Sequence, residues 1–166
     1  MLDMRPKIAF RVIHDADRDF LFSLFAAARE WEFEHTVWKD QEKAAFLKRQ
    51  FDIRTQAYQM TYLRAVHRII TLDDKDIGQL ILDRPDDHML IIDFVIAPEF
   101  QGKGIGSDIL KTLINEVHGG KVPIRLHVEK NNPALKLYLR HGFKVTGEEG
   151  HHHKLTWTPD LRPVEI

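Results

Sequence analysis

The alternation of apolar and polar positions predicts helices and strands in nearly equal number. Between residues 105 and 117 apolar side chains recur every three or four positions, which predicts an amphipathic helix. Residues 124–129 alternate apolar with polar side chains, the pattern of a half-buried strand. Residues 89–96 are almost continuously apolar, which is typical of a central strand covered on both faces.

The same criteria place the other elements. Strands are predicted at residues 8–13, 67–72, 77–82, 143–145 and 154–157, and helices after residue 17, from about residue 40 and at 133–141. Turns are predicted at 73–76 and 84–87, and Gly119 and Gly120 are expected to stop the helix before them. This order predicts a mixed α/β sheet with helices on both faces.

The composition indicates a globular protein and excludes several functional classes, but it does not indicate a particular function. A chain of 166 residues with 43% apolar and 30% charged residues suits one globular domain. The absence of cysteine excludes disulfides and cysteine nucleophiles. A formal net charge of −1 provides no general attraction for nucleic acid or an anionic membrane. No apolar run approaches the ~20 residues that span a bilayer, and residues 1–7 do not resemble a signal peptide, so we expect a cytoplasmic protein.

The glycine-rich segment at residues 101–106 is the clearest candidate for a ligand-binding loop. It lies between a predicted buried strand and a predicted helix, where glycines allow close backbone approach and the helix N-terminus attracts anions. A dinucleotide-binding motif is excluded because Ser107 occupies the position of its last glycine, and a P-loop is excluded because Gly104 follows Lys103. Phosphate binding and a tight turn that only opens a helix both remain open.

Two segments together resemble the GNAT family of acetyltransferases. Residues 98–106, Pro-Glu-Phe-Gln-Gly-Lys-Gly-Ile-Gly, resemble the family's (Arg/Gln)-x-x-Gly-x-(Gly/Ala) signature. Residues 131–143 resemble its second signature, Asn-x-x-Ala-x-x-Leu-Tyr-x-x-x-Gly-Phe. The resemblance covers residues 89–157 and implies the GNAT fold, with about seven strands and four helices on both faces of the sheet.

For the whole chain, the resemblance implies a single GNAT domain over residues 1–166. Residues 89–157 would form the acetyl-CoA-binding core, and residues 1–66 the variable acceptor side. The implied reaction moves an acetyl group from acetyl-CoA, used as a co-substrate without a metal, to a primary amine of a small molecule or peptide. A GNAT-fold module that binds acyl-CoA without turnover and an unrelated nucleotide-phosphate-binding domain are the alternatives, and homodimer formation is left open.

The resemblance also implies roles for individual residues. Backbone N–H groups of one loop would bind the pyrophosphate of coenzyme A, and the contacting residues would be Gln101, Gly102, Lys103, Gly104, Ile105, Gly106 and Ser107. Val95 and Ile96 would pair with the pantetheine arm where the central strand splays from the next strand, and one of their N–H groups would polarise the thioester carbonyl. Asn131 would hydrogen-bond the arm.

Tyr138 would protonate the leaving thiolate according to the same resemblance. A tyrosine hydroxyl ordinarily has a pKa near 10, so it is protonated and able to donate at neutral pH. Without the signature, Tyr138 would be read as a half-buried aromatic residue of a helix.

The base that deprotonates the amine is not settled by the sequence. Asp93 interrupts an apolar strand, where it is either a base or a hydrogen-bond anchor. His127 and Glu129 share one face of the next predicted strand, which is either functional or simply solvated. A water relay without a dedicated base is the further alternative.

The acceptor side and the histidine run complete the candidates. Trp31, Glu32, Glu34 and Trp38 combine aromatic rings with carboxylates, which suits a cationic amine; an ordinary connection between helices is the alternative. In the run from His151 to His153 only two side chains would share a face, so a hairpin turn is favoured over a metal site.

Overall fold

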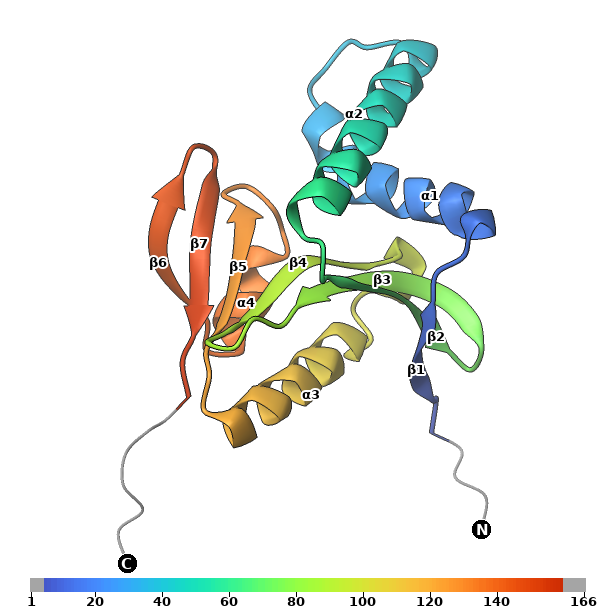
Figure 1. Cartoon of the computed structure of the whole chain (residues 1–166). Coiled ribbons are helices and arrows are strands. Elements are labelled where there is room, and N and C mark those ends of the chain that lie inside the picture. Colours follow the sequence, from blue (N-terminus) through green and yellow to red (C-terminus); the bar gives the residue numbers. More distant parts are fainter. Residues whose placement is uncertain (1–4, 160–166) are drawn as a thin grey trace, which may run out of the picture. The chain divides into compact units, whose positions relative to one another are not determined.

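The computed structural model describes residues 5–159, and its helices and strands confirm a mixed α/β fold (Figure 1). Within these residues are four α-helices and seven strands. The strands are hydrogen-bonded in the order β1 (Ile8–Val12), β2 (Val66–Leu72), β3 (Lys75–Asp83), β4 (Met89–Ile96), β5 (Ile124–Glu129), β7 (His152–Trp157) and β6 (Lys144–Glu149). β4 pairs with β5 in parallel, whereas β1–β2, β5–β7 and β6–β7 are antiparallel. The described residues divide into two compact units, one of residues 5–81 with 93–100 and one of residues 82–92 with 101–159.

The first unit contains most of the N-terminal half of the chain. Its elements are β1 (Ile8–Val12), α1 (Arg18–Ala28), α2 (Asp40–Thr61), β2 (Val66–Leu72), most of β3 (Lys75–Asp83) and the second half of β4 (Met89–Ile96), with short 3-10 turns at Asp15–Asp17, Glu30–Phe33 and Pro98–Phe100. The predicted helices near residues 18 and 40 are therefore confirmed.

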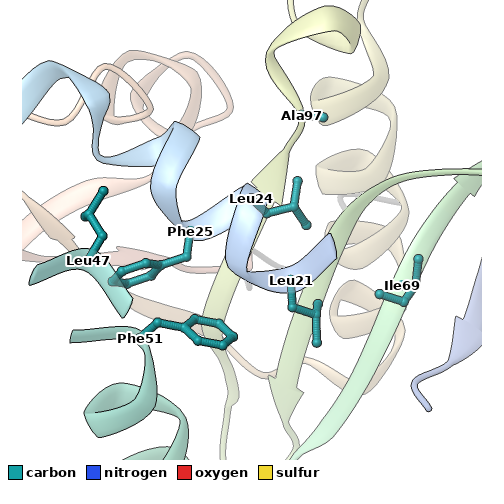
Figure 2. Close-up of a cluster of buried hydrophobic side chains, with 7 residues drawn as sticks. All are labelled: Leu21, Leu24, Phe25, Leu47, Phe51, Ile69 and Ala97. Carbon is teal, nitrogen blue, oxygen red and sulfur yellow. The ribbon is translucent and has the colours of Figure 1, made fainter. Parts of the chain in front are cut away.

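Helices α1 and α2 are held together by the core of this unit (Figure 2). The buried cluster consists of Leu21, Leu24, Phe25, Leu47, Phe51, Ile69 and Ala97. Three of these side chains come from α1 at helical spacing and two from α2, so the apolar periodicity of both helices is used in the same contact. The Phe51 ring lies 5.6 Å from the rings of both Phe22 and Phe25, which makes it the centre of an aromatic group.

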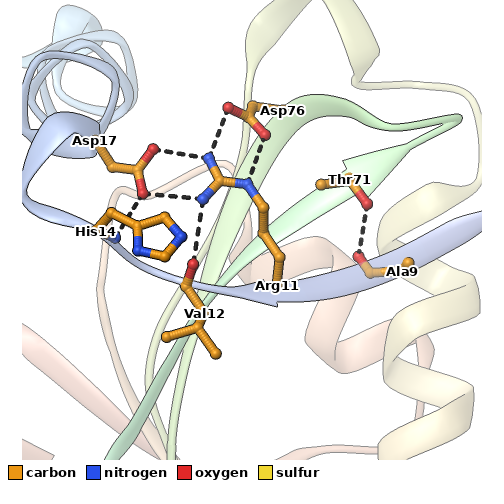
Figure 3. Close-up of polar contacts among 7 residues, drawn as sticks. All are labelled: Ala9, Arg11, Val12, His14, Asp17, Thr71 and Asp76. Carbon is orange, nitrogen blue, oxygen red and sulfur yellow. Dashed lines mark hydrogen bonds and ion pairs between the residues drawn. The ribbon is translucent and has the colours of Figure 1, made fainter.

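Arg11 ties the first strand to two other segments (Figure 3). Its guanidinium donates to Asp17 Oδ1 at 2.7 Å and to Asp76 Oδ2 at 2.8 Å. The hydrogen bonds from Arg11, together with one from the backbone N–H of His14, lower the pKa of Asp17 to about 2. The turn after β1 and the start of β3 are thus both bound to the Arg11 guanidinium. These contacts fix the position of the backbone just before α1.

The β2–β3 hairpin is tighter than the sequence predicts. Asp73 and Asp74 both have positive φ, 49° and 68°, as the central residues of a two-residue type I′ turn do. β3 consequently begins at Lys75 and not at residue 77, and Asp76 lies within the strand. The prediction of a four-residue turn was wrong because two aspartates suffice to reverse the chain.

The second unit contains β5 (Ile124–Glu129), α3 (Ile105–Gly120), α4 (Leu135–Arg140), β6 (Lys144–Glu149) and β7 (His152–Trp157), together with the first half of β4. β4 pairs with β5 at three positions, from Met89 opposite Ile124 to Ile91 opposite Leu126. The apolar face of α3 is buried as predicted, including Ile105, Ile109, Leu110, Leu113 and Val117.

Several predicted boundaries in the second unit need correction. Gly119 and Gly120 belong to α3, and Lys121, with φ of 56°, forms its left-handed cap. β6 and β7 are longer than predicted because they pair along Lys144–Glu149 and His152–Trp157. Gly150 and His151 form the turn, whereas His152 and His153 lie in β7, so only the first histidine of the run occupies the predicted hairpin turn.

Candidate active site

The glycine-rich loop opens helix α3 with its backbone accessible. Gln101 to Gly104 are exposed, and Ile105 is the first buried residue of α3. Gly104 has φ of 83° at the N-cap position, and a Cβ built there would meet no atom within 4 Å. The first intrahelical bond runs from Asp108 N to Gly104 O at 3.0 Å, so the N–H groups of residues 105–107 precede it. This arrangement of glycine, helix N-terminus and open space suits an anion.

Ser107 joins the two signature segments. Its hydroxyl lies 2.9 Å from His141 Nε2 and 3.5 Å from Arg140 NH2, both at the end of α4. Partial burial, followed by the charges of Arg140 and Lys111, lowers the pKa of His141, so this ring is neutral at pH 7. The sequence analysis missed His141, which lies 34 residues from Ser107 with no spacing rule to connect them.

Tyr138 is on α4 in the same unit and is only 5% exposed. Its ring packs edge-on against Phe143, with ring centroids 5.5 Å apart. The backbone N–H of Phe143 also donates to Tyr138 O at 3.1 Å, which folds the end of the second signature against its tyrosine. The position of the ring is therefore fixed by packing and by the main chain.

The two asparagines before α4 have different surroundings. Asn132 Oδ1 accepts from the backbone N–H of Ala134 at 2.9 Å, so this side chain caps the turn that leads into the helix. Asn131, the predicted contact to the pantetheine arm, is exposed in the turn after β5. The signature alone does not reveal this capping role of Asn132.

His127 and Glu129 lie on the outward face of β5, opposite its buried apolar residues. His127 Nε2 is 3.8 Å from Glu149 Oε2, and His152 Nε2 is 4.0 Å from Glu129 Oε1. The expectation that both residues share one face is confirmed by the alternating burial of the strand. Contacts of this length on an open face are typical of solvated polar side chains.

Asp93 in the first unit is held by two neighbours. Gln79 Nε2 donates to Asp93 Oδ2 at 2.6 Å, and Arg54 NH2 lies 3.4 Å from Asp93 Oδ1. Gln79 also contacts His67 Nε2 through its Oε1 at 2.9 Å. The sequence analysis recognised the buried acid but missed Arg54, Gln79 and His67, because the three belong to α2, β3 and β2.

The end of β4 approaches β3 unusually closely. A Cβ at Gly78 would lie 2.3 Å from the carbonyl oxygen of Val95, so only glycine fits at this position of β3. The N–H of Ala97 donates to Ile77 O at 2.7 Å and keeps the two strands together. The backbone course of Val95 and Ile96, the predicted thioester contacts, therefore depends on Gly78.

The predicted acceptor residues lie around the 3-10 turn Glu30–Phe33 and the start of α2. Glu32 is paired with Arg29 at 3.0 Å, and Glu30 forms an ion pair with Lys43. Glu34 is exposed and makes no ion pair to any residue between 5 and 159. The Trp38 ring is 44% exposed, with its centroid 5.0 Å from that of Phe46.

The indole nitrogen of Trp31 is a further feature of the predicted acceptor region. This Nε1 atom is buried and finds no hydrogen-bond acceptor in the described part of the chain. A buried indole N–H normally finds a partner, so Trp31 is an exception among the described residues.

Two features are absent from residues 5–159, the part of the chain that the structure describes. In this range, no three or more His, Cys, Asp or Glu side chains come together as a metal site would require. Nor does any helix there combine the length and apolarity needed to cross a bilayer.

Comparison with known proteins identifies the family. Residues 64–145 match the acetyltransferase (GNAT) domain model, and the chain carries a domain of this family. Comparison with curated protein sequences finds no match.

Solved structures confirm the fold over nearly the whole chain. PaiA N-acetyltransferase from Thermoplasma acidophilum, in complex with coenzyme A, is 17% identical with a TM-score of 0.68 over 92% of this chain and 99% of that one. PH1933 from Pyrococcus horikoshii is 22% identical, with a TM-score of 0.66 over 95% and 100%. The ribosomal-protein-S18-alanine N-acetyltransferase from Escherichia coli is 15% identical, with a TM-score of 0.60 over 96% and 99%.

Proposed function

We propose that the protein is an N-acetyltransferase that moves an acetyl group from acetyl-CoA to a primary amine by direct attack. The observation that carries the proposal is the contact of Ser107 with His141, which joins the glycine-capped loop to the helix bearing Tyr138. The loop proposed to bind phosphate and the tyrosine proposed as the proton donor belong to the same compact unit. The family of the domain and the coenzyme A complex of the Thermoplasma protein support the same co-substrate.

In this proposal each part of the chain has one chemical task. The backbone of Gln101 to Gly106, with Ser107, binds the pyrophosphate, and Asn131 contacts the pantetheine arm. An N–H group of Val95 or Ile96 polarises the thioester carbonyl, because a donor aimed at a developing oxyanion stabilises the tetrahedral intermediate. The C–S bond then breaks, and Tyr138 protonates the departing thiolate. These steps do not depend on the length of the acyl chain or on which primary amine is the acceptor.

Replacing Gly104 with valine should weaken acetyl-CoA binding at least tenfold, or about 1.4 kcal/mol. The valine side chain would fill the open space beside the loop and strain a residue with φ of 83°. Isothermal titration calorimetry measures the change. Gly150→Val is the matched control, since Gly150 also has positive φ, 58°, and open surroundings but lies in the β6–β7 turn. Unchanged affinity in a folded Gly104→Val protein would refute the loop assignment.

The acceptor is proposed to carry a second, charged amine. Glu34 offers an exposed carboxylate near aromatic rings, whereas Glu30 and Glu32 are already paired with cations. One ammonium group would stay charged beside Glu34 and Trp38, and the other amine would lose its proton and react. Diamines, polyamines and basic peptide termini should therefore be better acceptors than neutral amines of similar size.

Glu34→Gln should raise the KM for cationic acceptors more than for neutral ones, and added salt should reproduce part of this effect. Initial rates with a matched pair of acceptors, one cationic and one neutral, measure the difference. Glu42→Gln, which changes another exposed glutamate in the first turn of α2, should leave both KM values unchanged. Preference for acidic amines together with a silent Glu34→Gln would reject this acceptor class.

A further inference from the structure

A chain of five polar side chains links three neighbouring strands of the first unit to helix α2. His67 of β2 contacts Gln79 of β3 at 2.9 Å, and Gln79 contacts Asp93 of β4 at 2.6 Å. Arg54 of α2 lies 3.4 Å from the other oxygen of Asp93 and donates from Nε to Tyr58 Oη at 2.7 Å. Gln79 is only 7% exposed, so both ends of its amide need partners and have them.

The direction of this chain follows from the carboxylate. Asp93 as an ion only accepts hydrogen bonds, so Gln79 must turn its amide N–H toward Asp93 and its oxygen toward His67. The Gln79 oxygen in turn accepts, so Nε2 of His67 carries the ring hydrogen. The neutral imidazole is therefore fixed in one tautomer, with its basic lone pair on Nδ1.

Burial keeps the His67 ring neutral at pH 7, while most of the charges around it favour the uptake of a proton. Burial lowers the pKa of His67 below its ordinary value, and the nearby positive charge of Arg68 lowers it further. Asp93 and Asp17 act in the opposite direction, as does the hydrogen bond to Gln79. On α2, Arg54 and Tyr58 complete the set, with Arg54 paired to Asp93.

Both carboxylate oxygens of Asp93 are engaged with neighbours. One accepts from Gln79 and the other faces the Arg54 guanidinium. Nδ1 of His67 takes no part in the row of polar contacts through Gln79. The negative charge of Asp93 is separated from the His67 ring only by the Gln79 amide group. A proton arriving on Nδ1 is stabilised by that charge through Gln79, much as a carboxylate orients and stabilises a histidine base in other enzymes.

We propose that His67 takes up the proton of the acceptor amine at Nδ1, directly or through one water, and that Gln79 and Asp93 position its ring. This inference rests on the proposed function. The ammonium group of the acceptor gives its proton to His67, and the neutral nitrogen attacks the acetyl carbonyl. The C–N bond forms and the C–S bond breaks as Tyr138 protonates the thiolate. The nitrogen loses its second proton as the amide forms, and that proton restores the Tyr138 hydroxyl through solvent. His67 returns its own proton to solvent.

His67→Gln should lower kcat/KM for a diamine by roughly 10²–10⁴-fold and leave the Kd for acetyl-CoA unchanged. In the wild-type protein the acid limb of the kcat/KM profile should fall below pH ~6.5, the ordinary pKa of histidine, and the variant should lack that limb. Imidazole added to His67→Ala should restore part of the rate. His88→Gln is the matched control, because His88 is another half-buried histidine bonded to a neighbouring side chain, Asp87, at 2.7 Å.

Two charge changes distinguish a proton acceptor from a structural histidine. Gln79→Glu brings a negative charge next to His67, which raises its pKa and should move the acid limb to higher pH. Asp93→Asn removes a negative charge, which lowers the pKa of His67 and should move the limb to lower pH. A purely structural role would reduce the rate without moving the limb, and these shifts decide the matter even if His67→Gln fails to fold.

Wild-type kcat/KM in His67→Gln, or an acid limb that stays in place in both charge variants, would overturn the assignment of His67. A wild-type protein that binds acetyl-CoA but acetylates no amine would instead reject the proposed function, so the two failures are distinct.

Discussion

Tyr138→Phe should lower kcat by about 10²–10⁴-fold while the Kd for acetyl-CoA changes little. The substitution keeps a ring that is 5% exposed and packed against Phe143, and removes only the hydroxyl that is proposed to protonate the thiolate. The proposed pyrophosphate contacts come from the backbone of another segment, so binding should not depend on this oxygen. Steady-state rates and calorimetry on the same preparation measure the two quantities.

The control for this prediction is Tyr62→Phe, which removes a hydroxyl from a half-buried tyrosine whose ring lies 5.9 Å from that of Tyr58 in the first unit. It should keep kcat within about twofold, well short of the loss expected from removing a general acid. Wild-type turnover by a folded Tyr138→Phe protein would show that leaving-group protonation does not need Tyr138.

Phe51→Ala should reduce the free energy of unfolding by about 3–5 kcal/mol, the usual cost of removing a buried aromatic ring. Phe51 contacts the rings of Phe22 and Phe25 and joins α2 to α1 in the core of the first unit (Figure 2). Alanine leaves a cavity that these neighbours fill only in part. Chemical denaturation of both proteins, followed by circular dichroism, measures the difference.

Phe46→Ala provides the same chemical change on the same helix at a side chain that is 38% exposed. Its loss should cost about 1 kcal/mol, because its contacts with Phe33 and Trp38 are partly solvated. Equal losses from the two substitutions would contradict the core described for α1 and α2.

Periodicity predicts elements well where one pattern dominates a segment. The buried face of α3 and the alternation along β5 are read directly from residues 105–117 and 124–129. Boundaries are predicted less well where a local conformation decides them. Asp73 and Asp74 reverse the chain in two residues through positive φ, and Lys121 adopts the left-handed cap after two glycines that are expected to end the helix earlier.

The residues of the candidate site also differ in how well the sequence predicts them. The glycine loop and Tyr138 belong to contiguous signatures and are found from the sequence. The contact of Ser107 with His141 and the chain from His67 through Gln79 to Asp93 join residues of different elements. Such contacts depend on strand order and on how helices pack, which a single sequence does not specify.

Acyl transfer itself is tested most directly by incubating the 166-residue chain with acetyl-CoA and a panel of amines. Free thiol release and the mass of the amine product are followed together. The account predicts thiol release that depends on the amine, in equal amount to an amine product heavier by one acetyl group, with diamines reacting fastest. Binding of acetyl-CoA without amine-dependent thiol release across the panel would contradict it and would leave a GNAT-fold module that binds acyl-CoA without turning it over.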